Sequence, residues 1–202
     1  DAYCKQGVRK IFDYLLKSYK SGIKDVEAKK VMANMGTQGG IVFGSAFAGI
    51  ASAMANKISN KIGLTHGDAM AILLPHVMRY NAAIKLEGGK QSYFPQKRVA
   101  DTLERYANLA EKAGIKGNSK EASVNNLIKK VQDLAKDMNM AMSFKEHIAK
   151  NNIKITEKEF MAMAEEWANE AFGDQLTSGN PRYPLVTDLK KLYIDAYHGK
   201  VD

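Results

Sequence analysis

Length, composition and charge place the chain among ordinary globular proteins. It has 202 residues, enough for one domain or two, and 45% are hydrophobic and 26% charged, which excludes collagen-like, mucin-like and wholly disordered chains. Its 30 basic residues exceed the 22 acidic ones and give a net charge of +8, which favours anionic partners without specifying one. The only cysteine, Cys4, forms no disulfide within the chain and follows no charged-then-apolar leader, so we expect a reducing, cytoplasmic setting.

The N-terminal segment has the pattern of an amphipathic helix that ends at Gly22. Its apolar residues recur at steps of three and four: Val8, Ile11, Phe12, Leu15, Leu16 and Tyr19. Lysines cover the opposite side, which we interpret as a solvated face. A nucleic-acid interface would need interleaved aromatic residues or a known reading module. Neither is present, so we expect no specific nucleic-acid partner.

The next segment, Val31 to Asn56, contains no charged side chain. Its length alone would permit a membrane span, but its polar side chains and its five glycines make it weakly hydrophobic. We therefore expect no membrane partner and predict a helix, or a pair broken between Gly36 and Gly40, that is buried near the centre of a bundle. Small residues recur every four positions along it and would let neighbouring helices approach closely: Gly36, Gly40, Gly44, Ala48 and Ser52.

The rest of the chain also has helical patterns. We predict a helix over 68–81 in which Pro75 causes a kink or a boundary near Leu74. The Gly- and Pro-containing stretch 86–95 is expected to be a loop, and Asn180 to Pro184 a non-helical turn. Four further helices are predicted: 96–112 ending at Gly114, 120–138, 157–172 ending at Gly173, and 187–197 ending at Gly199.

Two capping-box patterns mark helix starts, Thr156 with Glu159 and Ser143 with Glu146. No segment alternates apolar and polar residues as a half-buried strand does. The sequence therefore predicts an all-α fold and a single helical domain over residues 1–202.

Candidate chemical groups are few. The glycines at 36, 39 and 40 lack the preceding strand that a dinucleotide-binding loop needs. Cys4 has no histidine near it in the sequence to activate its thiol. His66 and His76 are ten residues apart and fall on different helical faces. His66 lies near a helix start, where it is either a satisfied polar side chain, the better reading from the residues alone, or a metal ligand.

Three blocks of sequence together resemble the iron-dependent alcohol dehydrogenases, most closely the C-terminal portion of the bifunctional aldehyde-alcohol dehydrogenases. They are GLTHGDAMAILLPHVMRYNA (63–82), GNPRYPLVTDLKKLYIDAYHG (179–199) and GSAFAGIASAMANKI (44–58). The resemblance implies the all-helical, dehydroquinate synthase-like domain that holds the metal in that family, without the α/β nucleotide-binding domain that precedes it. It also implies iron or zinc and NAD as cofactors, and hydride transfer between an alcohol and an aldehyde with the metal as Lewis acid.

Only part of the family's ligand set has a counterpart in this sequence. The resemblance places the family's Asp-x-x-x-His pair before Asp1, the next histidine ligand at Ser52, a histidine near the substrate at Asn56, and the last ligand at His66. A hydroxyl is a weak neutral ligand, and one imidazole does not hold a catalytic metal that normally has three or four protein ligands.

Two hypotheses follow from this incomplete set. The chain is either the helical portion of an iron-dependent, NAD-linked alcohol dehydrogenase, inactive as an isolated chain, or a non-catalytic interaction module derived from one. Its status as an enzyme is left open. No catalytic or cofactor-binding residue is assigned, and His66 is the one metal-ligand candidate. The expected partners are a nucleotide-binding half or further copies of the chain.

Overall fold

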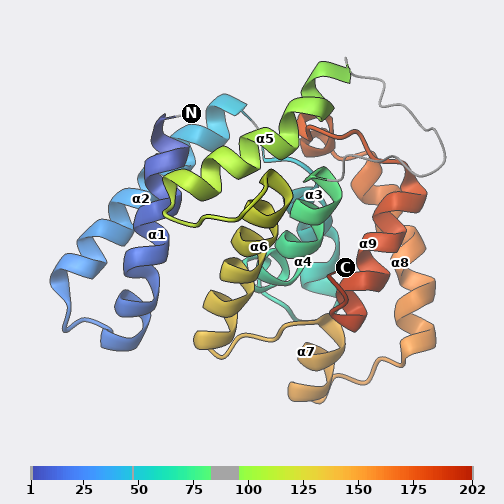
Figure 1. The fold of residues 1–202 in the computed structure, drawn as a ribbon. Coiled ribbons are helices and arrows are strands. Elements are labelled where there is room, and N and C mark those ends of the chain that lie inside the picture. Colours follow the sequence, from blue (N-terminus) through green and yellow to red (C-terminus); the bar gives the residue numbers. More distant parts are fainter. Residues whose placement is uncertain (1, 47, 83–95, 202) are drawn as a thin grey trace. The chain divides into compact units, whose positions relative to one another are not determined.

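A computed structural model describes residues 2–46, 48–82 and 96–201, and every regular element in them is helical (Figure 1). The predicted all-α class is therefore confirmed. In chain order the elements are α1 (Ala2–Ser21), α2 (Val26–Ala46), α3 (Ile50–Ile58), η1 (Ser59–Lys61), α4 (His66–Ala82), α5 (Gln96–Lys112), α6 (Lys120–Asp137), α7 (Phe144–Lys150), α8 (Glu157–Phe172), η2 (Gln175–Gly179) and α9 (Val186–His198).

The helices group into two compact units. The first comprises Asp1–Phe47 and Leu103–Asn139, and the second comprises Ala48–Thr102 and Met140–Asp202. Within the first unit α1 packs along α2 and also touches α6. Within the second, α3 contacts α4, α8 and η2, while α9 packs against α4, α7 and α8. The expectation of one domain over residues 1–202 stays a prediction.

Helix α2 corrects the prediction of a buried segment over 31–56. It continues through Gly36 and Gly40 without a break, and only Ala28 and Met35 are buried in it. The chain leaves the helix after Ala46 instead, and α3 is the part that is buried. A glycine costs a helix only about 1 kcal/mol relative to alanine. The three glycines between positions 36 and 40 therefore do not end a helix whose other backbone hydrogen bonds are made.

The exposed glycines of α2 give a prediction opposite to that for a buried helix. A Cβ atom added at Gly44 meets nothing within 4 Å, so Gly44→Leu should not overpack the structure. We expect the free energy of unfolding to rise by less than about 1 kcal/mol, because leucine has a better helix propensity than glycine. Urea denaturation followed by circular dichroism measures it. A loss of several kcal/mol would show that this helix face is covered in solution.

The other predicted elements are largely confirmed. Helices α5 and α8 have the predicted bounds, while α6 and α9 differ from theirs by a residue at one or both ends. Helix α4 continues through Pro75, so the boundary near Leu74 is wrong: packing of α4 against α3 and α9 outweighs the backbone hydrogen bond that proline cannot make. The turn over 180–184 is non-helical, as predicted. The expected loop 86–95 lies outside the described residues.

The two capping patterns differ in detail. Thr156 and Glu159 form the full reciprocal capping box at the start of α8. Ser143 caps α7 by accepting from the backbone N–H of Glu146 at 3.0 Å, but the Glu146 carboxylate accepts from Met142 N at 2.7 Å. The second box is thus displaced by one residue. Both arrangements satisfy backbone donors that a helix start leaves unpaired.

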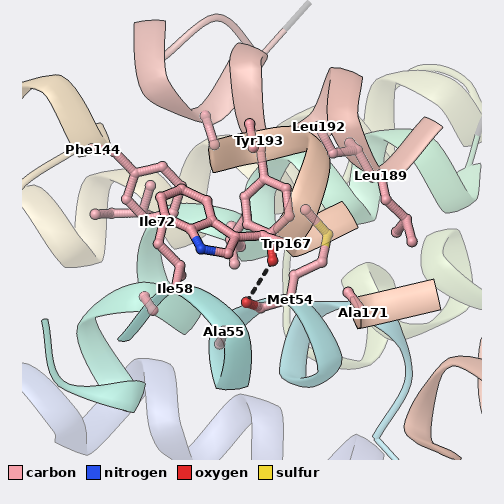
Figure 2. Close-up of a cluster of buried hydrophobic side chains, with 14 of the residues drawn as sticks. Met54, Ala55, Ile58, Ile72, Phe144, Trp167, Ala171, Leu189, Leu192 and Tyr193 are labelled. Atoms are coloured by element: carbon pink, nitrogen blue, oxygen red, sulfur yellow. Dashed lines mark hydrogen bonds between the residues drawn. The ribbon is translucent and has the colours of Figure 1, made fainter. Parts of the chain in front are cut away.

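The second unit holds a core of aromatic, aliphatic and small residues around Trp167 (Figure 2). Trp167 is 1% exposed and lies edge-on to Phe160 and Tyr193, with ring centroids 5.3 and 5.8 Å away. The Tyr193 hydroxyl donates to the backbone carbonyl of Met54 at 2.7 Å, as the dashed line in Figure 2 shows. Burial raises the pKa of this hydroxyl well above its ordinary value. Helix α9 is thereby fixed to the middle of α3.

A membrane span requires a helix that is both long and apolar, and this requirement applies to each of the described helices. None of them is, on its own, both long and apolar enough to cross a bilayer. Only α2 taken together with the segment Ile50–Lys61 reaches the required length and composition. The cytoplasmic setting expected from the sequence stays a prediction.

Candidate functional site

Helix α3 carries two of the three positions that the family resemblance selects, and it is the most deeply enclosed helix of its unit. Seven of its nine residues are buried. Three of its residues are alanine and one is serine, and such small side chains allow the backbones of neighbouring helices to approach closely. Residues 52 and 56 both lie within this helix, so a helix and not a loop determines their positions.

Ser52 lies on the side of α3 that faces α4. It is 7% exposed, and its hydroxyl donates to the Met70 sulfur at 3.6 Å. Met70 is four residues after His66 on α4, which is about one helical turn. The structure therefore places Ser52 against the turn of α4 that follows His66.

His66 is the first residue of α4, as the sequence predicted for a helix start. The residue before it, Thr65, caps the helix: its hydroxyl accepts from Asp68 N at 3.1 Å and contacts the Asp68 carboxylate at 2.6 Å. The His66 side chain is exposed. It is thus available at the surface, and among the described residues it belongs to no group of three or more ligand-forming side chains that could hold a metal.

Asn56 follows Ser52 by one turn of α3 and is also exposed. Its side-chain amide hydrogen-bonds to Asp174, which Lys57 also contacts at 2.9 Å. Burial alone would raise the pKa of Asp174, but the hydrogen bonds from Leu176 N, Lys57 and Asn56 together hold it below its usual value. Asn56 is therefore engaged with a structural carboxylate.

These three side chains do not fit a catalytic iron or zinc centre. The Ser52 hydroxyl is directed at a thioether, the Asn56 amide is directed at Asp174, and one imidazole is left. Within the described ranges 2–46, 48–82 and 96–201, no group of three or more His, Cys, Asp or Glu side chains could hold a metal ion. Three or four ligands from such side chains are the usual minimum for a catalytic divalent metal. We therefore derive no chemical step through a metal.

A buried polar network around Asn180 was not predicted from the sequence. Asn180 and Asn81 are 5% and 3% exposed and exchange two side-chain hydrogen bonds at 2.8 and 3.3 Å. Arg182 donates to the backbone carbonyl of Tyr80 at 2.9 Å and stacks over its ring at 3.9 Å. Burial raises the pKa of the Tyr80 hydroxyl, which donates to Asp188 at 3.2 Å. This network joins the end of α4 to the turn before α9. The Asn-Pro pair signals the turn in the sequence, but nothing in it indicates the partner.

His76 was also missed as a buried titratable group. It is 3% exposed on α4, and its Nε2 atom has no hydrogen-bond partner. Burial lowers its pKa to about 4, against the smaller opposite effects of Asp195 and of a hydrogen bond to the backbone of Lys200. The sequence predicted that His76 and His66 lie on different helical faces, and the structure agrees, since His66 is exposed and His76 is buried. It lies in the core and contributes nothing to a site at α3.

Comparison with known proteins identifies the family. The model of the Fe-containing alcohol dehydrogenase family, C-terminal, matches residues 1–197. The aldehyde-alcohol dehydrogenase of Clostridium acetobutylicum is 32% identical over 95% of this chain, and aldehyde-alcohol dehydrogenase 2 of Entamoeba histolytica is 34% identical over 98%. The chain spans 21% of the length of each. It spans 45% of the NADPH-dependent butanol dehydrogenase of Clostridium saccharobutylicum, to which it is 31% identical over 98% of its residues.

Solved structures give the same answer for the fold. An iron-containing alcohol dehydrogenase from Thermococcus thioreducens superposes with a TM-score of 0.77 and 27% identity, over 98% of this chain and 44% of that one. A 1,3-propanediol oxidoreductase superposes equally well, with a TM-score of 0.77 and 24% identity over 97% of this chain and 44% of that one. The chain therefore belongs to the Fe-containing alcohol dehydrogenase family and corresponds to its C-terminal, helical part.

Proposed function

We propose that this chain is the helical portion of an iron-dependent, NAD-linked alcohol dehydrogenase and that, alone, it neither holds a catalytic metal nor interconverts an alcohol and an aldehyde. One observation carries the proposal. Two side chains at the positions where the resemblance expects histidines are a hydroxyl donating to Met70 and an amide bonded to Asp174. A metal would have to displace the contact of Ser52 with Met70 and would gain a weak neutral ligand there.

The chemistry of the family explains why these differences matter. The metal polarises the substrate oxygen as a Lewis acid, and the nicotinamide carries the hydride. The carboxamide of Asn56 neither takes up nor releases a proton near neutral pH. The resemblance also assigns NAD to an α/β domain, whereas the described residues form only helices. The side chains of Ser52 and Asn56 supply neither an electrophile nor a general base at α3.

The direct test measures metal and turnover together. After incubation with iron(II) or zinc and gel filtration, we expect elemental analysis to find far less than one metal per chain. We expect no NAD-linked oxidation of ethanol or butanol above the blank. Stoichiometric metal accompanied by turnover that disappears in His66→Ala would contradict the proposal and would restore an enzymatic function to this chain.

A second candidate is a non-catalytic interaction module. One feature favours it: the uncharged half of α2 presents Ile41 and Phe43 about half exposed, at 53% and 51%, and exposed apolar side chains of this size are typical of contact surfaces. A nucleotide-binding half or a second copy of the chain would be the partner. Whether the natural gene encodes a nucleotide-binding domain with an Asp-x-x-x-His motif upstream separates an enzyme portion from a free-standing module.

A further inference from the structure

Both ends of helix α3 are bonded to one short stretch of the chain, residues 174–180, which we call the α3 clamp. Asp174 contacts the C-terminal turn of α3, and Asn180 contacts its N-terminus. Helix η2 forms the middle of the clamp and packs against α3. A segment of seven residues thus fixes a helix of nine at both of its ends.

At the C-terminal end of α3, two consecutive residues converge on one carboxylate. Lys57 Nζ lies 2.9 Å from Asp174 Oδ2, and the Asn56 amide hydrogen-bonds to the same side chain. Asp174 also accepts from Leu176 N at 3.0 Å and so caps η2. The ion pair is mostly enclosed, with 25% of the Lys57 side chain and 12% of the Asp174 side chain exposed. Such a pair is less screened by water and salt than one on the surface.

At the N-terminal end, Asn180 supplies the cap that α3 lacks. The residue before the helix is Gly49, which has no side chain to accept a backbone N–H and whose φ is +88°. Asn180 Oδ1 accepts from Ile50 N at 3.4 Å instead. A Cβ at Gly49 would lie 2.9 Å from this same oxygen. Glycine is therefore required both by the left-handed conformation and by the approach of Asn180.

The clamp is itself fixed to the core. Thr177, in the middle of η2, is fully buried, and its hydroxyl donates to the carbonyl of Ala171 on α8 at 2.6 Å. Asn180 is paired with Asn81 at the end of α4. Through these hydrogen bonds the clamp fixes the position of α3 relative to α8 and α4.

We propose that the α3 clamp fixes helix α3 without any metal and that Asn56 is a working part of it. The inference rests on the proposed function, because a metal held between α3 and α4 would tie the two helices together by itself. An amide suits this place: it donates to Asp174 at any pH near neutral and adds no charge beside Lys57. An imidazole would carry a second positive charge there when protonated.

The first experiment compares two asparagines of the same region. Asn56→Ala should lower the thermal midpoint by about 3 °C or more, the shift expected for loss of one hydrogen bond to a charged group in a domain of this size. Asn60→Ala is the matched control, because Asn60 is also an exposed asparagine and lies in the next turn, in η1. It should change the midpoint by less than about 1 °C. Equal midpoints for the two variants would overturn the role of Asn56.

A double-mutant cycle shows whether the effect passes through Asp174. In an Asp174→Ala background, Asn56→Ala should cause no further fall of the midpoint, whereas two additive falls would refute the proposed contact. Carbon-13 NMR provides a second readout: the pKa of Asp174 should rise in Asn56→Ala because one of its hydrogen-bond donors is lost. An unchanged Asp174 pKa would also count against the clamp.

Metal additions distinguish failure of the clamp from failure of the proposed function. With EDTA or with zinc, the thermal midpoint of the wild-type chain should stay the same. A rise of several degrees with zinc that is abolished in His66→Ala would overturn the proposed function and the metal-free clamp together. If zinc leaves the thermal midpoint unchanged but the double-mutant cycle shows no coupling between Asn56 and Asp174, the clamp alone would be overturned.

Discussion

Replacing Trp167 with alanine should lower the free energy of unfolding by about 3–5 kcal/mol, the largest effect we expect from any single substitution. The indole is 1% exposed and contacts the rings of Phe160 and Tyr193. Figure 2 shows it at the centre of side chains contributed by α3, α4, α7, α8 and α9. Its removal would leave a cavity between these helices. Several of them would have to move to fill it.

Urea denaturation monitored by circular dichroism measures this effect, since the variant lacks the chain's only tryptophan and with it the fluorescence signal. Tyr19→Ala is a suitable control, because Tyr19 is 57% exposed on α1. It should change the free energy of unfolding by no more than about 0.5 kcal/mol. A similar, small loss in both variants would mean that Trp167 does not organise the core.

Acidification should destabilise the second unit through His76. Burial holds the pKa of this imidazole at about 4, against its ordinary value of 6.5. The unfolded chain therefore takes up a proton between these two values and the folded chain does not. Stability contributed by neutral His76 is fully present above about pH 6.5 and falls as the pH is lowered toward 4. From pH 7 to pH 5 the loss should be about 2 kcal/mol.

The variant His76→Phe isolates this contribution from the other titrating groups. Its free energy of unfolding should fall less steeply between pH 7 and pH 5 than that of the wild type. The nearby charges on α9, Asp195 and Lys191, are kept in the variant and shift the His76 pKa in opposite directions. Equal slopes for the two proteins would show that His76 is already protonated or solvated in the folded state.

Helix positions could be predicted from the sequence where a local signal determines them. The bounds of α8 follow from the Thr156 cap and from Gly173, both of which act within a few residues. The burial of α2 was predicted wrongly, because an uncharged, glycine-rich segment is compatible with a buried helix and with an exposed one. Burial depends on which other segments cover a helix. The sequence of the helix does not contain that information.

The candidate site, like the helices, could be predicted from the sequence only in part. The resemblance could select Ser52, Asn56 and His66 by their order in the chain, and His66 does lie at the predicted helix start. It could not indicate that the Ser52 hydroxyl meets Met70 or that Asn56 meets Asp174, since these contacts join residues 18 and more than 100 positions apart. Contacts of that range depend on the whole fold.

The cap of helix α3 has a consequence for the order in which the chain folds. The hydrogen bond from Ile50 to Asn180 spans 130 residues, and the one from Tyr193 to Met54 spans 139. Contacts so distant in sequence form only after large loops have closed, which slows folding. During synthesis α3 emerges from the ribosome long before either partner exists. We therefore expect this helix to reach its native state late, when the last quarter of the chain has been made, although it lies in the first third of the sequence.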